Sequence, residues 1–310
     1  MPELCVGLRR WSVPDASNLL DALNQAGLNV PYSCRAGRCH ACLVRCLNGE
    51  PQDARPEALS AQQRAEGWRL ACQCRVVGDL QVAPFDPHSD AVPARVEQID
   101  WLGDVLRLQL LPDRALRYQA GQHVVLWRHG IARPYSLASV PGEDRGLAFH
   151  IDCRRPGAFC DLARQLRVGD ELGLGELRSG ALHYDRDWQD RPLWLLAAGT
   201  GLAPLWGILR EAVRQEHAGP IRVLHLAHST QGHYLAQALD ALAAEVGGIS
   251  VQYGLPEQLP EALAGLRGLP RQALVLACGA PDTVEQFARA LFMAGLPRSQ
   301  LFADMFTPSG

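Results

Sequence analysis

Residues 34–42 read CRAGRCHAC, a short stretch that holds three cysteines and two arginines. The thiols of Cys34, Cys39 and Cys42 follow the spacing C-x4-C-x2-C, and Cys72 follows as a distant fourth thiol. Seven of the chain's ten cysteines precede residue 75, so we expect the first quarter to form a unit of its own. We expect a cytosolic chain, whose thiols stay reduced, and such a group of cysteines then favours metal ligation or redox chemistry over disulfides.

This spacing is the plant-type ligand pattern for a [2Fe-2S] cluster. A cluster with four thiolates carries net negative charge, which Arg35 and Arg38 would offset, while Gly37 lets backbone N–H groups turn toward the sulfurs. A structural zinc site is the alternative. Zinc sites usually pair two C-x2-C knuckles, and the four-residue gap fits that pattern poorly.

The fourth ligand is less tightly specified by the sequence. The downstream stretch LACQC offers Cys72 and Cys74, two residues apart. We predict Cys72, so that the predicted metal ligands are Cys34, Cys39, Cys42 and Cys72.

Length and charge limit the classes of function. A chain of 310 residues is too long for one typical core and predicts two or three domains. A net charge of -3 gives no basic surface for nucleic acid. The apolar run at residues 193–209 is broken by glycine and proline, which favours a buried strand, a turn and a helix start over a membrane span. The first residues show no secretory signal, so we expect a cytoplasmic protein that binds no membrane.

The sequence around the cysteines extends the pattern. It reads SNLLDALNQAGLNVPYSCRAGRCHACLVRCLNGEP over residues 17–51 and GWRLACQCRVVGDLQV over residues 67–82. Residues 3–84 resemble plant-type ferredoxins, which implies an α+β fold of the β-grasp type with the cluster near the surface. A cluster in that position can pass electrons to a partner. We assign residues 1–86 to this first domain.

A change of composition marks the second domain. Residues 83–94, APFDPHSDAVPA, contain three prolines and predict a linker. The stretch VLRLQL alternates leucine with polar residues as a half-buried strand does, and GQHVVLW and LAFHIDC look like further strands. Short strands separated by turns predict a small antiparallel β-barrel, which we place at residues 92–187.

Two stretches of this barrel carry candidate chemistry: ARPYSLAS at residues 132–139 and HIDCRRPGAFCDLARQLRVGDEL at residues 150–172. A glycine-containing turn into a helix over Cys160–Leu166 would present unpaired N–H groups to a pyrophosphate. The R-x-Y-S stretch would cover a flavin ring with an aromatic face and hydroxyl donors.

Both stretches resemble the flavin domain of the ferredoxin reductase family. The resemblance implies FAD, with Tyr135 against the isoalloxazine, Arg133 toward the phosphates and Ser136 within reach of flavin N5. It implies further cofactor contacts at Pro134, His150, Ile151, Gly157, Ala158, Phe159 and Cys160. The sequence departs from the family where Cys160 replaces the usual Ser or Thr and where Asp161 adds a negative charge.

The last third alternates apolar strands with helical patterns, which predicts an α/β domain with a doubly wound parallel sheet at residues 188–310. In such sheets ligands bind at the carboxyl ends of the strands, where Gly199-Thr200-Gly201 and Cys278-Gly279-Ala280-Pro281 fall. AAGTGLAP and CGAP resemble the nicotinamide dinucleotide domain of the same family. The resemblance implies that Gly199, Thr200 and Gly201 face the NAD pyrophosphate and ribose, with Gly279 and Pro281 beside the cofactor. It implies that Cys278 approaches the nicotinamide near the hydride path.

Nucleotide choice follows from charge. The stretch HSTQGHYLAQALD after the second strand holds no Arg or Lys for a 2'-phosphate, which favours NADH over NADPH. His228 or His233 would be the groups there that assist a phosphate. Near the C-terminus, Asp304 is a further catalytic candidate beside Ser136 and Cys278, because the family usually has an acid and an aromatic residue close to its end.

The order of the three domains resembles reductase components of bacterial multicomponent oxygenases. NADH gives up two electrons together while a [2Fe-2S] cluster accepts one, so FAD must convert between them. We therefore expect a monomeric NADH-dependent oxidoreductase that passes electrons to an external acceptor protein such as an oxygenase component. The alternatives are a reductase for a deoxysugar dehydratase system, an iron-sulfur carrier without its own flavin or NAD chemistry, and a zinc-stabilised binding protein.

Overall fold

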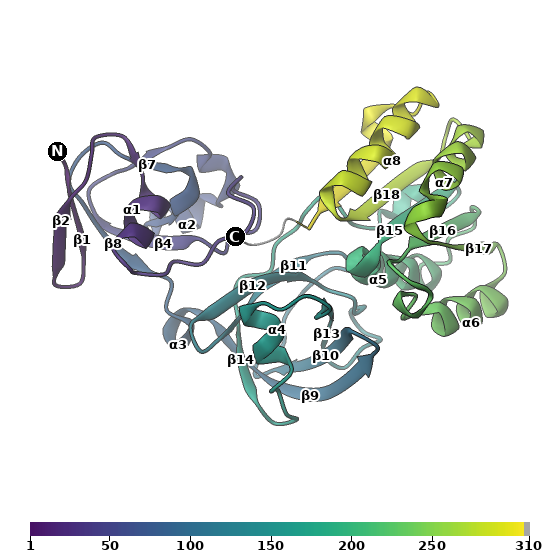
Figure 1. Cartoon of the computed structure of the whole chain (residues 1–310), viewed down its shortest axis with the longest axis horizontal. Helices are drawn as coiled ribbons and strands as arrows, with labels where there is room; N and C mark the ends of the chain where they lie inside the picture. Colours follow the sequence, from purple (N-terminus) through teal and green to yellow (C-terminus); the bar gives the residue numbers. More distant parts are fainter. Residues whose placement is uncertain (307–310) are drawn as a thin grey trace.

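The computed structural model describes residues 1–306, which form three modules in chain order (Figure 1). We name them the N-terminal module (β1–β8), the middle module (β9–β14) and the C-terminal module (β15–β19). Each has an apolar core of its own, and the C-terminal module has one on each face of its sheet.

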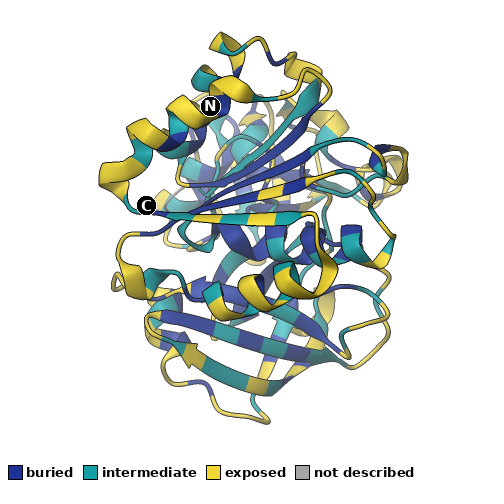
Figure 2. Cartoon of the chain, turned by 90° about the vertical axis from the view of Figure 1, so that its right-hand side faces the viewer, coloured by how far each residue is buried: buried dark blue, intermediate teal, exposed yellow. Residues whose placement is uncertain are grey.

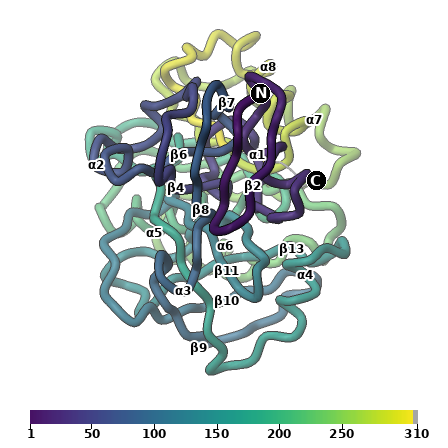
Figure 3. The backbone as a smooth tube through the Cα atoms, turned by 90° about the vertical axis from the view of Figure 1, so that its left-hand side faces the viewer, coloured from purple at the N-terminus to yellow at the C-terminus, as the bar shows by residue number. Residues whose placement is uncertain are grey.

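The N-terminal module is a mixed β-grasp sheet covered by a short helix (Figure 3). Its five strands, in the order β2-β1-β8-β4-β6, are Arg9–Ser12, Glu3–Val6, Leu80–Pro84, Leu43–Asn48 and Trp68–Leu70. A second small sheet contains β3 (Ser17–Asn18), β7 (Cys74–Val76) and β5 (Gln52–Asp53). The helices are α1 (Leu19–Gln25), α2 (Ala61–Ala65) and the one-turn η2 (Ala71–Gln73).

Helix α1 forms where the sequence supplies both a cap and an apolar face. The Asn18 side chain accepts a hydrogen bond from the Asp21 backbone N–H at 3.2 Å, which satisfies one of the free donors at the helix start. Leu19, Leu20 and Leu23 are fully buried against the sheet. The cap and this buried face fix the helix just before the cysteine loop.

The middle module is a six-stranded antiparallel barrel, as the alternating patterns predicted. The strand order β12-β11-β14-β9-β10-β13 corresponds to Ile131–Ser136, His123–Arg128, Glu171–Leu174, Val92–Leu102, Val105–Pro112 and Leu147–Asp152. A hydrogen bond of 2.8 Å from the Ala138 N–H to the Ala148 carbonyl links the segment after β12 to β13. That bond closes the barrel beside the R-x-Y-S stretch.

Two local predictions for this module need correction. The stretch expected as a linker contains the short helix α3 (Pro87–Asp90), because Asp86 caps it and Pro87 opens it. The helix expected at Cys160–Leu166 is α4 (Ala158–Ala163). It starts directly after Gly157, whose extended backbone lets the chain turn into the helix earlier than the apolar pattern indicated.

The C-terminal module is a parallel sheet with helices on both faces. The order β17-β16-β15-β18-β19 corresponds to Ile249–Gly254, Ile221–Leu226, Leu193–Ala198, Leu274–Gly279 and Leu301–Met305. Its helices are α5 (Leu202–Arg214), α6 (Ala236–Val246), α7 (Leu259–Gly265) and α8 (Pro281–Met293). Helices α6, α7 and α8 expose one face and bury the other (Figure 2), whereas α5 is almost entirely buried. Strand order reverses between β15 and β18, and ligands of such sheets bind at that reversal.

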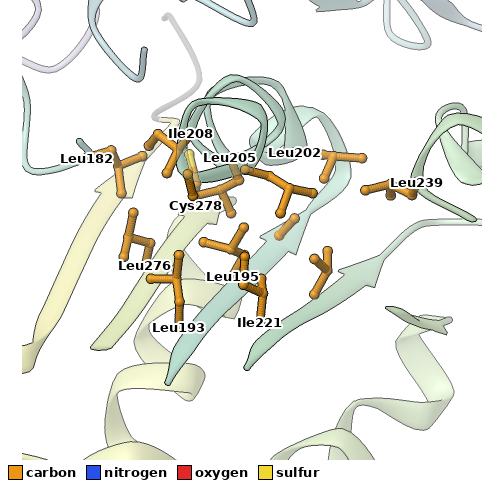
Figure 4. Packing of buried hydrophobic residues seen from close by; sticks show 14 of the residues in the cluster. Leu182, Leu193, Leu195, Leu202, Leu205, Ile208, Ile221, Leu239, Leu276 and Cys278 are labelled. Carbon is orange, nitrogen blue, oxygen red and sulfur yellow. The ribbon is translucent and has the colours of Figure 1, made fainter. Parts of the chain in front are cut away.

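The broken apolar run at residues 193–209 folds as β15, the one-turn helix η4 (Gly199–Gly201) and the start of α5. All of its leucines except Leu196 pack with those of β18 and α6 in a common core (Figure 4), and Leu196 packs on the other face of the sheet. Within residues 1–306, no helix has the length and apolar character needed to cross a bilayer.

Replacing Gly201 tests the packing at the strand reversal. A Cβ on Gly201 would lie 2.1 Å from the backbone oxygen of Cys278, so Gly201→Ala must push β18 and η4 apart. We expect a cost of at least about 3 kcal/mol, seen as faster hydrogen exchange in β15 and β18 and as lost nucleotide binding. Gly265→Ala is the matched control, because a Cβ there meets no atom within 4 Å. Equal exchange in both variants would contradict this account.

Candidate functional site

The cysteine loop between α1 and β4 gathers backbone donors around one sulfur. Cys34 Sγ accepts hydrogen bonds from the N–H groups of Ala36, Arg38 and Cys39, each at 3.3 Å. Gly37 has φ +71°, a left-handed conformation that glycine adopts without strain, and the loop curls around the sulfur as the sequence predicted. The hydrogen bond with the Cys39 thiol, together with these backbone bonds, stabilises the thiolate and lowers the pKa of Cys34 to about 5 against the opposing effect of burial.

The four predicted thiols lie together as two pairs. Cys34 is hydrogen-bonded to the Cys39 thiol, and Cys42 to the Cys72 thiol. Within the described residues no three His, Cys, Asp or Glu side chains are grouped tightly enough for one metal ion. A two-iron cluster needs a pair of thiolates on each iron, so two neighbouring pairs fit it better than they fit a single zinc ion.

The structure separates the two candidates for the fourth ligand. Cys72 lies in η2, and its sulfur accepts a hydrogen bond from Gln73 Nε2 at 3.3 Å. Cys74 is fully buried in the core of the module, and burial raises the pKa of its thiol. The geometry therefore favours Cys72 beside Cys42.

Other polar groups support the loop in ways the sequence did not indicate. Arg55 donates to the Ala36 carbonyl at 3.0 Å, and Gln73 donates to the Arg35 carbonyl at 2.9 Å. Arg35, predicted to balance the cluster charge, is paired with Asp21. Its charge is thus partly neutralised within the protein.

The cysteine loop packs directly on the middle module. Cys39 and Ala41 share a buried apolar cluster with Val125 and Trp127 of β11 and with Ala132 of β12. The same strand β12 carries the R-x-Y-S motif. The candidate cluster and the candidate flavin site therefore meet across one interface.

The R-x-Y-S residues divide between the two faces of β12. Tyr135 packs toward the barrel core, with its ring centroid 4.9 Å from that of Phe159. Ser136 is buried on the opposite face, directly across from His123 of β11. Arg133 donates to the Ala132 carbonyl at 2.8 Å and stays partly exposed, and Pro134 shares the face of Ser136.

The turn before α4 has room for a ligand. Gly157 gives the helix no side-chain cap, so the N–H groups of Ala158, Phe159 and Cys160 donate to no capping side chain. A Cβ on Gly157 would meet nothing within 4 Å. These residues therefore fit a phosphate group. A hollow of about 420 Å³ lies beside this turn and is lined by Ala158 and Ile131, among others.

The His150 side chain is buried and contacts the C-terminal module. Its Nδ1 is 3.0 Å from the hydroxyl of Tyr234 in that module. Burial lowers the pKa of His150 to about 3, so the ring is neutral at physiological pH. Ile151, its neighbour, is buried in the barrel core. His150 thus joins two modules, and the predicted contact of both residues with the cofactor stays a prediction.

The two glycine-containing motifs of the C-terminal module meet at the strand reversal. Gly199 has φ +57° and open space around its Cα, whereas Gly201 and Gly279 lie against the backbone of the neighbouring loop. His225, fully buried on β16, lies with its Nε2 3.1 Å from the Gly199 carbonyl and supports this loop from below. Thr200 is partly exposed, and Pro281 is the first residue of α8. The motifs form one edge, as the sequence predicted.

Cys278 and Asp304 are adjacent across β18 and β19. The thiol is fully buried among leucines beneath α5 (Figure 4), so its approach to a nicotinamide stays a prediction. Burial raises the pKa of Asp304, while the charges of His123 and Arg38 oppose that rise. His123 and Arg38, whose charges act on Asp304, belong to the other two modules. Residues 307–310 lie outside the described chain.

Three buried polar side chains at this junction escaped the sequence analysis. Nδ1 of His40, Nε2 of His123 and Nε of Arg178 are buried without a hydrogen-bond partner in the described residues. His123 and Arg178 are joined by backbone hydrogen bonds of 2.9 and 2.8 Å, and burial together with the charges of Arg178 and His123 lowers the pKa of His40 to about 3. Orphaned polar atoms of this kind are expected where a bound group completes the hydrogen bonding. His40, His123 and Arg178 are single polar residues in separate segments, so no periodic pattern in the sequence could have revealed them.

Comparison with known proteins supports this architecture. Residues 8–77 match the family model of the 2Fe-2S iron-sulfur cluster binding domain, and residues 195–290 match the oxidoreductase NAD-binding domain. A reductase component of naphthalene 1,2-dioxygenase/salicylate 5-hydroxylase systems from Ralstonia sp. is 31% identical over 95% of this chain and 94% of its own. This chain belongs to the ferredoxin–NAD(P) reductase family. The reductase is of the three-module type with an N-terminal plant-type [2Fe-2S] domain, and its cofactors are the cluster, FAD and a nicotinamide dinucleotide.

Two further relatives show the breadth of the family. The crystal structure of the Amycolatopsis cytochrome P450 reductase GcoB superposes on the reductase with a TM-score of 0.68, at 26% identity and 99% coverage of both chains. The CDP-6-deoxy-L-threo-D-glycero-4-hexulose-3-dehydrase reductase of Yersinia pestis is 24% identical over 94% of each chain. The reductase is therefore an oxidoreductase that hands electrons to a separate acceptor protein.

Substitution of Cys72 and of Cys74 by alanine tests which of the two thiols is the fourth ligand of the cluster. We expect Cys72→Ala to lose the iron and the visible absorbance of the cluster, because one iron loses a thiolate. Cys74→Ala, the matched variant two residues away, should keep two irons per chain as wild type does. Iron and sulfide analysis of both purified variants makes the measurement. Iron loss in Cys74→Ala with retention in Cys72→Ala would reverse the assignment.

Proposed function

We propose that the reductase takes electrons from NADH and supplies them, through the cluster held by Cys34, Cys39, Cys42 and Cys72, to an oxygenase component. One observation carries this proposal: the cysteine loop packs on β11 and β12, the strand pair that bears Ser136. The candidate flavin site and the one-electron cluster site thus share an interface in one chain. The flavin supplies the exchange between two-electron and one-electron chemistry there.

The chain's own residues take distinct tasks in this proposal. Arg133 and the uncapped turn at Gly157–Cys160 hold the FAD phosphates, and Tyr135 gives the ring an apolar wall. Ser136 presents its hydroxyl to the reacting edge of the flavin from the face it shares with His123. The tight glycine loops of the C-terminal module hold the nucleotide, and Cys278 with Asp304 lies at the far side of the same junction.

The preference for NADH rests on the end of β16. Residues 227–248 contain no Arg or Lys, so a 2'-phosphate would meet no permanent positive charge on this stretch. His233 is partly buried, and burial lowers its pKa, which keeps it neutral at physiological pH. A neutral imidazole binds a phosphate dianion weakly, and the unphosphorylated nucleotide is favoured.

The free thiols of the reductase bear on its compartment, and its relatives bear on its acceptor. All ten cysteines are free thiols, which fits a reducing compartment, and we propose that the reductase acts in the cytoplasm as a monomer. An oxygenase is the proposed acceptor because the Ralstonia relative, at 31% identity, serves one, whereas the deoxyhexulose dehydrase reductase is 24% identical.

An anaerobic titration tests the function. NADH should bleach the flavin and cluster absorbance of the purified reductase at about 1.5 equivalents, because FAD takes two electrons and the cluster takes one. NADPH should require at least a tenfold excess, which corresponds to about 1.4 kcal/mol. A purified aromatic-ring oxygenase component should then reoxidise the cluster band. Failure of both nucleotides would make the chain an electron carrier reduced by another protein. Reoxidation by a deoxysugar dehydratase alone would change the acceptor.

Ser136→Ala tests the proposed hydride site. We expect the anaerobic rate of flavin reduction by NADH to fall about tenfold, because the lost hydroxyl is worth about 1.4 kcal/mol in the transition state. The FAD content should not change, since the phosphate contacts lie elsewhere. Ser250→Ala, at an exposed position on β17, is the matched control. An unchanged rate would remove Ser136 from the site, and loss of FAD would give it a structural role.

A further inference from the structure

Two thiols of the middle module lie side by side outside the cluster site. Cys153 directly follows β13 and is fully buried, whereas Cys160 is the third residue of α4 and is partly exposed. The Cys160 thiol lies 3.4 Å from the carbonyl oxygen of Asp152, the residue before Cys153. The Cys153 thiol is itself hydrogen-bonded to the Cys160 side chain. The two sulfur atoms therefore face each other across the turn at residues 154–159.

Both thiols are held in place by the surrounding backbone. The Cys153 N–H donates to the Asp104 carbonyl at 2.9 Å, and the Arg164 guanidinium donates to the Cys153 carbonyl. The Arg164 N–H donates to the Cys160 carbonyl at 3.0 Å, so the same residue fixes both ends of the turn. The pair is thus available for reaction without unfolding of the barrel.

Exposure gives the two thiols different roles. Cys160 reaches solvent and can meet a small oxidant, whereas Cys153 is enclosed by the barrel core. Burial, with the neighbouring Cys160, raises the pKa of Cys153 to about 12, which makes it a poor first nucleophile. Cys160 is therefore the attacking thiol and Cys153 the resolving one.

We propose that Cys153 and Cys160 form a reversible dithiol site that reacts with hydrogen peroxide to give an intramolecular disulfide. The Cys160 sulfur attacks one peroxide oxygen, the O–O bond breaks, one water leaves, and Cys160 becomes a sulfenic acid. The Cys153 sulfur then attacks the Cys160 sulfur, the S–O bond breaks, and a second water leaves with the thiol proton. Two electrons pass from the two sulfurs to the peroxide, and a dithiol restores both thiols.

The bond would close over the turn that precedes α4. Gly157 and the uncapped N–H groups that follow it lie between the two cysteines. Phe159, which packs against Tyr135, lies there too. Oxidation would therefore fix the turn and the start of α4 against the end of β13. The proposal itself depends only on the sulfur geometry and holds whichever nucleotide or acceptor the reductase uses.

Peptide mapping of the intact holoprotein tests the disulfide. The protein is treated with a small excess of hydrogen peroxide, quenched with catalase, alkylated with N-ethylmaleimide and digested with trypsin without reduction. Trypsin cleaves after Arg154 but not at the Arg155–Pro156 bond, so the two cysteines fall on residues 146–154 and 155–164. We expect these peptides to appear linked, two hydrogens lighter than their sum, and to separate with dithiothreitol.

Two variants and the cluster absorbance show whether the disulfide forms specifically between Cys153 and Cys160. Cys160→Ser should form no link, and Cys153→Ala should leave a sulfenic acid on Cys160 that dimedone traps. The linked pair should form before peroxide bleaches the cluster band. The proposal is overturned if both cysteines remain alkylated after treatment. It is equally overturned if the link appears only once the cluster is lost, because released cluster thiols would then be the source of the exchange.

Discussion

The packing of the cysteine loop against β11 and β12 is the contact on which the rest of the molecule depends. Phe85, at the end of the N-terminal module, stacks on Trp127 with ring centroids 4.8 Å apart. The stack holds the start of the connecting segment against the barrel, so the short helix α3 does not act as a free hinge. Two redox groups exchange electrons efficiently only at a fixed short range. An apolar interface with almost no exposed surface supplies that fixed range.

The polar groups at the same junction explain why three modules meet there. His40 comes from the cysteine loop, His123 from β11 and Asp304 from the last strand, and the charge of Asp304 acts on His123. Each buried polar atom left without a partner costs about 1–3 kcal/mol. A fold keeps such atoms where function requires them, and the family's flavin, placed at this junction in our proposal, would supply the missing partners.

Sequence patterns predicted the elements whose residues act locally. Alternating leucines predicted β10, and the C-x4-C-x2-C spacing predicted the cysteine loop. Glycine between an apolar strand and a helix predicted the turn at Gly199. Features that depend on contact between modules were not predictable. His123 was recognised only when the strand register placed it across from Ser136. His150 was named from the sequence, but its contact with Tyr234, 84 residues away along the chain, was not predicted. Cys72 was chosen over Cys74 from the sequence, and the fold adds a physical reason, because Cys72 lies beside Cys42 while Cys74 is fully buried in the core.

Cys160 and Asp161, the two residues of the α4 turn that depart from the family pattern, are both compatible with binding of an anion. A thiol at Cys160 donates hydrogen bonds weakly where the family generally has a hydroxyl, and this leaves phosphate binding to the backbone N–H groups. Asp161 would repel a phosphate, but Arg164 lies 3.3 Å away on the next helical turn and pairs with it. Because both side chains are largely exposed, this pair offsets the charge of Asp161 only in part. The turn therefore keeps its capacity for an anion while gaining, at Cys160, a sulfur with a reactive neighbour.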